Sequence, residues 1–218
     1  MEADLGVRLA RESGRLGLSL PPSQIGDLLR YMDLLWRWNA RMNLVGFRDR
    51  TVLLTEGVID ALTLLSAFTP HPGQRLLDVG SGAGLPGIPL KVAAPEIDAT
   101  LLEPIRKRVS FLLTVVRELG LTRIRVVRGR SEEISSLEEH RRAYEIVTAR
   151  AVAGVEEAAR TAAPFVAPHG LLILPRGQEA AREAEGLRGG SAGGLVVDRL
   201  LPSPLGRGDR HLLLLRAP

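Results

Sequence analysis

The hydrophobic pattern of this chain changes period along its length. From residue 75 onward, short apolar runs alternate with longer segments whose apolar positions recur every three or four residues. The short runs, which predict strands, lie at 75–79, 99–102, 124–127, 146–147 and 171–174. The amphipathic segments, which predict helices, lie near 86–94, 105–119, 131–139, 154–166 and 178–188. This alternation predicts an α/β domain with a parallel sheet covered by helices on both faces.

The end of the chain departs from this alternation. A glycine-rich stretch at 186–194 is followed by two apolar runs, 195–201 and 211–215, with no room for a helix between them. Such a pair predicts a hairpin that adds an antiparallel edge to the sheet. A parallel sheet with a C-terminal antiparallel hairpin resembles the architecture of class I methyltransferases, a Rossmann-like fold. Architecture alone does not fix a function.

Before residue 75 the pattern is helical. Pro21, Pro22 and Ser23 predict the start of a helix with Ser23 as its N-cap, and apolar residues at helical spacing run from 25 to 36. A second helix is predicted at 52–67, whereas residues 1–20 predict a short helix or a loose arm. The sequence Pro-His-Pro-Gly at 70–73 breaks the pattern. We therefore predict an N-terminal helical extension at 1–72, packed on a methyltransferase-like domain at 73–218.

Composition narrows the class of protein. Hydrophobic residues make up 45% and charged residues 25%, and no apolar run reaches the roughly 18 residues that span a bilayer. The amino terminus has no apolar segment typical of a signal peptide, so we expect a cytoplasmic protein. Cysteine is absent and the four histidines are scattered, which predicts no disulfide, thiolate nucleophile or metal site. The net charge of +4, carried mainly by arginine, permits nucleic-acid binding without demonstrating it.

The strongest local signal follows the first predicted strand. It reads Asp78-Val79-Gly80-Ser81-Gly82-Ala83-Gly84-Leu85-Pro86-Gly87, with Pro86 suited to the first turn of the next helix. Glycines here let the backbone take positive φ and approach a ligand closely. The spacing also fits a dinucleotide fingerprint, but the Asp78 carboxylate would repel a pyrophosphate and would favour the ammonium and sulfonium groups of S-adenosylmethionine. We expect this cofactor to be held by Asp78, Gly80, Ser81, Gly82 and Gly84.

Two later positions extend the predicted cofactor site. Glu103 ends the second predicted strand, where its carboxylate can accept hydrogen bonds from both ribose hydroxyls. After the third strand, Ser131 is a candidate helix N-cap, with Glu132 in the favourable first turn. In methyltransferases this position meets the adenine through backbone groups, so Ser131 and Glu132 join the predicted site. Capping alone explains both residues equally well.

The residues after the fourth predicted strand restrict the methyl acceptor. They read Val147-Thr148-Ala149-Arg150-Ala151, not the Asn/Asp-Pro-Pro-aromatic tetrad of amine-directed methyltransferases. Cytosine C5 chemistry is excluded because it needs a cysteine nucleophile. Guanine N7 fits, since its lone pair attacks without loss of a proton and needs alignment rather than a general base. Arg150 is the predicted catalytic residue and also borders the cofactor site; its structural alternative is an ion pair with Glu145.

Several motifs together resemble the ribosomal RNA small-subunit methyltransferase G family, also called GidB. They are Trp38–Leu44 (WNARMNL), Gly80–Pro89 (GSGAGLPGIP), Lys107–Leu112 (KRVSFL), Thr148–Ala151 (TARA) and Arg210–Leu212 (RHL). The resemblance runs from about residue 25 to the end. It implies methyl transfer to guanine N7 in bacterial 16S rRNA, with the small ribosomal subunit or an assembly intermediate as partner. A monomer is the expected state.

The resemblance also assigns Asn39, Asp60, Arg176 and Arg210 to the RNA side. Asn39 and Asn43 lie four apart and share a face if helical, although a local cap or turn explains them equally well. The family usually has histidine where this chain has Gly57, and Leu-Lys-Gly where it has Pro175-Arg176-Gly177. These departures leave room for a non-catalytic RNA-binding or assembly factor with the same fold. Two enzymatic interpretations also stay open, a nicotinamide-dependent oxidoreductase and a methyltransferase that acts on a small molecule.

Overall fold

The structure, a computed structural model, describes residues 2–149, 154–187, 191–204 and 210–218. The strands are β1 (Arg75–Val79), β2 (Asp98–Glu103), β3 (Ile124–Arg128), β4 (Tyr144–Ala149), β5 (Val166–Arg176), β6 (Val196–Pro202) and β7 (His211–Arg216). The α-helices are α1 (Glu2–Arg15), α2 (Pro22–Met42), α3 (Arg50–Val52), α4 (Asp60–Leu62), α5 (Gly87–Ala93), α6 (Arg106–Glu118), α7 (Ser131–Ile134), α8 (Val155–Ala162) and α9 (Ala180–Gly186). A π-helix, η1 (Leu53–Ile59), and two 3₁₀ helices, η2 (Thr63–Ser66) and η3 (Ala163–Phe165), complete the described elements.

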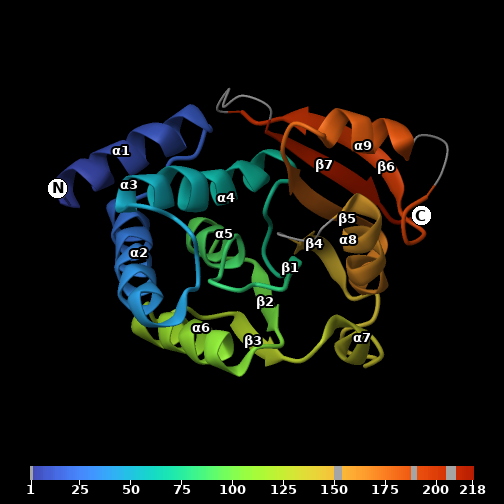
Figure 1. Cartoon of the computed structure of the whole chain (residues 1–218), viewed down its shortest axis with the longest axis horizontal. Helices are drawn as coiled ribbons and strands as arrows, with labels where there is room; N and C mark the ends of the chain where they lie inside the picture. The colour runs from blue at the N-terminus through green and yellow to red at the C-terminus, as the bar shows by residue number, and fades with distance from the viewer. Residues whose placement is uncertain (1, 150–153, 188–190, 205–209) are drawn as a thin grey trace.

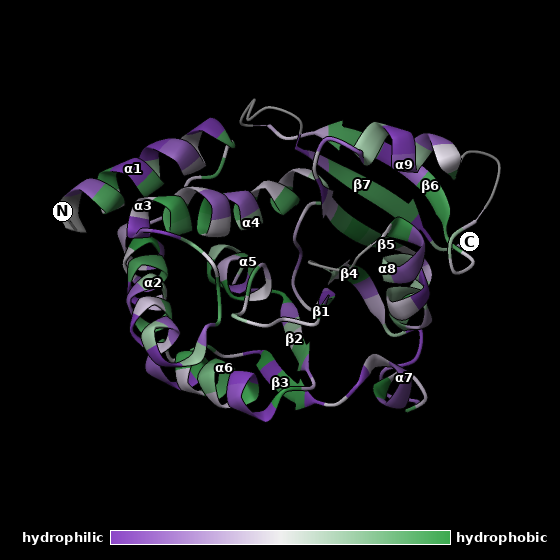
Figure 2. Cartoon of the chain, in the orientation of Figure 1, coloured by the Kyte–Doolittle hydropathy of each residue, from purple (hydrophilic) through white to green (hydrophobic). Residues whose placement is uncertain are grey.

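The strands form one sheet in the order β3-β2-β1-β4-β5-β7-β6 (Figure 1). The first five are parallel, and β7 pairs antiparallel with both β5 and β6. The predicted parallel sheet with a C-terminal antiparallel hairpin is therefore confirmed. β7 lies between two strands and is buried and hydrophobic along most of its length, whereas β6 forms the half-exposed edge (Figure 2).

Alternate residues of the strands face opposite layers of helices, as the two-residue period of a strand requires. Leu76 packs in a cluster with residues of α5, whereas Leu77 packs in a cluster with residues of α8 and α9. Helices α1 and α2 lie on the same side as α5 and α6, and share a third hydrophobic cluster with them (Figure 1). The extension and the sheet domain thus share a buried core. The division at residue 72 stays a prediction.

Two predicted helix starts are wrong, the first by two residues and the second by one. Helix α2 has Pro21 rather than Ser23 as its N-cap and begins at Pro22. Proline suits this first position because its missing N–H would have no partner inside the helix. Pro86 is the N-cap of α5, which begins at Gly87. The predicted helix at 52–67 is a continuous helical path from α3 to η2 whose hydrogen-bond pattern changes from one segment to the next.

The helix predicted near 131–139 is shorter than expected. It ends at Ile134, and turns follow. Just past its end, the hydroxyls of Ser135 and Ser136 donate to the carbonyl oxygens of Glu132 and Glu133, respectively. Side chains that bond back to the backbone in this way compete with continued helix.

The N-terminal helices hold the glycine-rich loop from outside. The Tyr31 hydroxyl, fully buried on α2, donates to the carbonyl oxygen of Ala83 at 2.7 Å. Trp38 of the same helix packs against Phe111 of α6, with ring centroids 5.5 Å apart. Within the described ranges, no helix is both long and apolar enough to cross a membrane.

Candidate functional site

The glycine-rich loop between β1 and α5 folds back toward β2. The N–H groups of Gly80 and Ser81 both donate to the carbonyl oxygen of Leu102, at 2.8 and 3.0 Å. Gly80, Gly82 and Gly84 have φ angles of 69°, 56° and 83°. Residues with a Cβ rarely adopt this region. The prediction that these glycines supply positive φ is therefore confirmed.

Asp78 lies beneath this loop. Its carboxylate is 1% exposed and accepts a hydrogen bond from the N–H of Gly87, the first residue of α5, at 3.1 Å. The buried Ser81 hydroxyl donates to the backbone carbonyl of Asp78 at 2.9 Å. Both side chains thus fix the path of the loop from behind, and neither lines the cleft described next. Direct contact of Asp78 or Ser81 with a cofactor stays a prediction.

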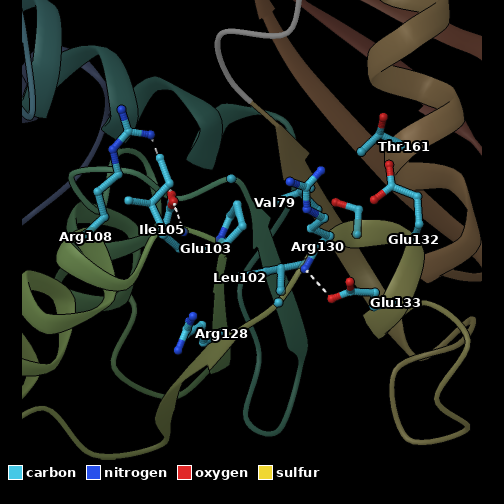
Figure 3. A pocket seen from close by; sticks show the side chains of 14 residues that line it. Val79, Leu102, Glu103, Ile105, Arg108, Arg128, Arg130, Glu132, Glu133 and Thr161 are labelled. Atoms are coloured by element: carbon cyan, nitrogen blue, oxygen red, sulfur yellow. Dashed lines mark hydrogen bonds and ion pairs between the residues drawn. The ribbon is translucent and has the colours of Figure 1, made fainter.

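An open cleft of about 980 Å³ lies where β1, β2 and β3 reach their carboxyl ends (Figure 3). In open α/β sheets this edge is the usual place for ligands. The cleft is lined by Val79, Gly80, Leu102, Glu103, Pro104, Ile105, Arg108, Arg128, Gly129, Arg130, Ser131, Glu132, Glu133 and Thr161. It brings together Gly80, Glu103, Ser131 and Glu132, four residues that the sequence assigned to one cofactor.

Glu103 is the most constrained acid of the cleft. Its side chain is 1% exposed, and its two oxygens accept hydrogen bonds from the N–H groups of Gly82 at 2.8 Å and Ile105 at 2.9 Å. An ionised carboxylate has about four acceptor sites, so two remain for other donors. The Arg108 guanidinium lies 3.9 Å away. Glu103 therefore both fixes the loop and presents acceptors at the cleft wall.

Ser131 does not cap a helix, contrary to the expectation. Arg130 is the N-cap of α7, and its N–H donates to the Glu133 carboxylate at 3.3 Å (Figure 3). Ser131 is the first helical residue, so its side chain is not placed to reach the N–H groups one turn further on. Glu132 lines the cleft from the same short helix. Their contact with a cofactor stays a prediction.

Sequence reasoning missed several residues of the cleft. Arg108, Arg128 and Arg130 line it together with Ile105, a large apolar residue that is 46% exposed. The arginines come from α6, the end of β3 and the segment before α7, and only the fold brings them together. Ile105 could have been predicted from the sequence. It follows the strand that ends at Glu103, and residues just after such a strand lie at the edge of the sheet where ligands bind.

A second cavity, of about 370 Å³, contains three of the four residues predicted on the RNA side. Asp60, Arg176 and Arg210 line it, together with Phe47 and Glu56. The Arg210 guanidinium lies 2.8 Å from the Asp60 carboxylate and 3.4 Å from that of Glu56. Burial lowers the pKa of Arg210, but the charges of these two carboxylates and their hydrogen bonds outweigh burial and raise it above its ordinary value. Arg210 thus stays a cation held at the cavity wall.

Asn39 lies outside both cavities. Its side-chain oxygen accepts a hydrogen bond from the N–H of Val45 at 2.9 Å, and its carbonyl oxygen accepts one from the N–H of Asn43 at 3.2 Å. Asn43 is the C-cap of α2, with a φ angle of 48°. The two asparagines therefore close the end of the helix, which is the local explanation of their spacing. A contact of Asn39 with RNA stays a prediction.

Arg150, the predicted catalytic residue, lies outside the described residues. Its proposed structural partner, Glu145, is described and is engaged at the amino end of β4. There it accepts a hydrogen bond from the N–H of Arg75 at 2.9 Å and lies 3.5 Å from the His71 ring. Arg150 follows the other end of this strand, the end beside the cleft.

Comparison with known proteins decides the family. The family model GidB, described as rRNA small subunit methyltransferase G, matches residues 24–195. The chain belongs to this family. It is 36% identical over 186 residues to the ribosomal RNA small subunit methyltransferase G of Alkaliphilus metalliredigens. The aligned region covers 84% of this chain and 78% of the relative. The protein of the same name from Symbiobacterium thermophilum is 36% identical over 209 residues, 92% of this chain and 85% of the relative.

Solved structures agree on the fold of this GidB family member. A SAM-dependent methyltransferase from Aquifex aeolicus aligns with a TM-score of 0.58 over 86% of this chain and 98% of that chain. The sequence identity is 14%, so the likeness concerns the fold alone. The class I methyltransferase fold, expected from the pattern of strands and helices, is confirmed.

Gly57 marks a local departure within this GidB chain. It is buried in η1, and a Cβ there would lie 3.0 Å from the Leu53 Cδ1 atom and 3.3 Å from the Phe47 Cε2 atom. The Leu85 Cδ1 atom would lie 3.4 Å away. The imidazole that the family resemblance leads one to expect would therefore require these neighbouring side chains to shift. The Phe47 ring occupies the space beside this glycine and also lines the second cavity.

Proposed function

We propose that this protein is an S-adenosylmethionine-dependent methyltransferase that modifies guanine N7 in 16S rRNA, in the small ribosomal subunit or an assembly intermediate. The GidB match over residues 24–195 carries the proposal, because relatives that span most of the chain are named ribosomal RNA small subunit methyltransferases. We expect it to act as a cytoplasmic monomer. The nucleobase and atom come from the family resemblance and from the chemistry of the acceptor.

The cleft residues fit the proposed cofactor, whose sulfonium carries an electrophilic methyl group. The remaining acceptor sites of the Glu103 carboxylate suit two vicinal hydroxyls. A Cβ at Gly80 would meet no atom within 4 Å, so the loop leaves open space beside its backbone. Ile105 offers an apolar surface for a base, and Ser131 and Glu132 line the same cleft. Asp78, Ser81, Gly82 and Gly84 would act by fixing the loop.

The acceptor side needs alignment rather than proton transfer. Guanine N7 attacks with an in-plane lone pair and loses no proton, so no general base is required. Arg150 would orient the guanine or its phosphate beside the cofactor, since it follows β4 at the edge where the cleft lies. Asp60, Arg176 and Arg210, gathered at the second cavity, would contact the surrounding RNA, and Asn39 is a further predicted contact.

Methyl transfer to ribosomal particles tests the proposal. The protein is incubated with methyl-labelled S-adenosylmethionine and small subunits from a strain that lacks this enzyme family, with stripped 16S rRNA and tRNA in parallel. We expect label in the subunits, released by the cleavage chemistry specific for N7-methylguanine. Absence of label from every RNA, despite measured cofactor binding, would contradict the proposal and favour a non-catalytic RNA-binding factor.

Two further measurements separate the roles within the site. Arg150→Ala is expected to abolish transfer while the affinity for S-adenosylhomocysteine stays within a few-fold of wild type. Loss of cofactor binding and of thermal stability in this variant would instead indicate a structural arginine. Quenching of tryptophan fluorescence by S-adenosylhomocysteine but not by NADH is expected; the reverse would favour a nicotinamide-dependent oxidoreductase.

A further inference from the structure

A third cavity lies across α8 from the cofactor cleft. Its volume is about 450 Å³, and three arginines line it: Arg141 and Arg142, which precede β4, and Arg160 of α8. The adjacent residue Thr161 lines the cofactor cleft, so the end of α8 separates the two spaces. All three arginines are exposed. We call this cavity and its three arginines the α8 basic surface.

The charges of the α8 basic surface have no acidic partner among the described residues. No ion pair within 4.0 Å joins Arg141, Arg142 or Arg160 to a carboxylate there, and no acidic side chain lines the cavity. Pro218 also lines the cavity. Most other exposed arginines face acids, such as Arg123 with Asp98. Within the part of the chain that the structure describes, the three guanidinium groups are therefore not engaged in ion pairs.

The backbone holds these arginines in place. The N–H of Arg142 donates to the carbonyl oxygen of Pro164 at 2.8 Å, and that of Arg141 to the carbonyl oxygen of Leu137 at 3.0 Å. Arg142 has a φ angle of 48°, a region that non-glycine residues adopt rarely and mostly where surrounding structure fixes them. Their Cα positions are thus set before any partner binds.

A tight turn adds a second, independent feature suited to an anion. Gly193 and Gly194 line the same cavity with φ angles of 59° and 83°. The flanking residues Ala192 and Leu195 bond to each other across the turn, at 2.9 and 3.0 Å, whereas the N–H groups of the two glycines donate to no described residue. Backbone N–H groups in a turn can donate to an anion, and these two are not used within the described structure.

We propose that the α8 basic surface binds backbone phosphates of the RNA substrate, at nucleotides remote from the one that reacts. The choice of RNA rests on the proposed function, since arginines with turn N–H groups match phosphate oxygens and the proposed substrate is a polyanion. Tyr144 begins β4 beside this surface, whereas Ala149 ends it beside the cleft. Five residue steps at ~3.3 Å each place the two ends about 17 Å apart. A phosphate at this surface therefore belongs to another nucleotide.

Salt-dependent RNA binding tests the inference. Fluorescence anisotropy measures the affinity of the full chain for a labelled 20-base-pair RNA duplex at several salt concentrations. The variant Arg141→Gln/Arg142→Gln/Arg160→Gln is expected to bind at least tenfold more weakly at low salt. The slope of log affinity against log salt should shrink by about 2 to 3, because each lost phosphate contact removes ~0.7 to 0.9. Circular dichroism and the melting temperature check that the variant is folded.

A charge-matched control removes three exposed arginines elsewhere. Arg30, Arg117 and Arg182 each face a glutamate and lie outside the three cavities described above. Replacing all three by glutamine changes the net charge equally and should shrink the slope by less than 1. Equal weakening by both triple variants, or unchanged binding by the first, would overturn the inference.

Two more readouts separate this inference from the proposed function. The first triple variant should keep its affinity for S-adenosylhomocysteine and raise the KM for small subunits at least fivefold with kcat retained. If the wild type transfers no methyl while the first triple variant still loses RNA affinity, the proposed function fails and the surface stands. If the wild type transfers methyl and the variant matches it in affinity and KM, the surface fails alone.

Discussion

Glu103→Gln separates the charge of this side chain from its shape. In the wild type, one carboxylate oxygen accepts from the N–H of Gly82 and the other from the N–H of Ile105, at 2.8 and 2.9 Å. A glutamine amide has one accepting oxygen and one donating NH2 group. Its NH2 group must face one of these two N–H donors, so one backbone bond becomes a repulsion. The same group cannot accept from a ribose hydroxyl.

The magnitude follows from the bonds that disappear. Hydrogen bonds to a charged group contribute ~1.5 to 3 kcal/mol each. Loss of one such bond to the cofactor predicts an affinity lower by ~10- to 150-fold, since 1.4 kcal/mol corresponds to a factor of ten. The unpaired backbone N–H costs a further ~1 to 3 kcal/mol of unfolding free energy, because this site is buried.

Isothermal titration calorimetry with S-adenosylhomocysteine measures the affinity, and urea titration measures the free energy of unfolding. Glu118→Gln is the control, because this half-buried acid at the end of α6 lies outside the cleft. It should change neither quantity appreciably. A folded Glu103→Gln protein whose affinity falls less than threefold would refute the assignment of Glu103 to the cofactor.

Three other outcomes are expected. Gly87→Ala should lower the free energy of unfolding in urea by ~1 to 3 kcal/mol, since its Cβ would lie 2.3 Å from the Leu101 Cδ2 atom. Gly26→Ala, with no atom within 4 Å, should raise it by ~0.5 to 1 kcal/mol; the opposite ranking would contradict the packing argument. Burial lowers the pKa of His140, so the unfolded chain binds a proton first and stability measured in urea should fall as pH drops from ~7 to 5. His140→Gln should flatten this slope, and an unchanged slope would exclude His140 as its source. Arg210→Ala should shrink the salt slope of RNA binding by ~1 without altering cofactor affinity, and loss of cofactor affinity would contradict its placement.

Elements whose apolar residues recur at a regular spacing were predictable from the sequence. The bounds of β1 agree with the apolar run at 75–79, and the hairpin followed from two apolar runs too close to enclose a helix. The wrong helix ends arose where two local interactions compete for the same residues. Ser23 is a good capping residue, but Pro22 fits the first helical position and moves the cap to Pro21. The helix after β3 ends early where Ser135 and Ser136 bond to the backbone.

The residues of the candidate site also fall into two groups, those that the sequence predicted and those that it did not. The glycine-rich loop and Glu103 were predictable because their chemistry and position lie within one βαβ unit. Arg108, Arg128 and the arginines of the α8 basic surface were not, because each reaches its cavity from a separate element, and an isolated arginine in a sequence usually belongs to a solvated face. Asn39 is a rare residue that suggested recognition, and the structure shows it closing a helix, while its contact with RNA stays a prediction.

The bond between Tyr31 and the carbonyl of Ala83 leads us to expect that cofactor binding and the order of α2 depend on each other. A ligand that favours one loop conformation also favours the helix that holds it, and thermodynamic linkage makes this effect reciprocal. Amide hydrogens of α2 should therefore exchange more slowly when S-adenosylhomocysteine is bound, although they lie outside the cleft. Tyr31→Phe keeps the ring and removes the bond, so it should reduce this protection and weaken the cofactor by a similar free energy. The N-terminal helices are in this sense an energetic part of the cofactor site.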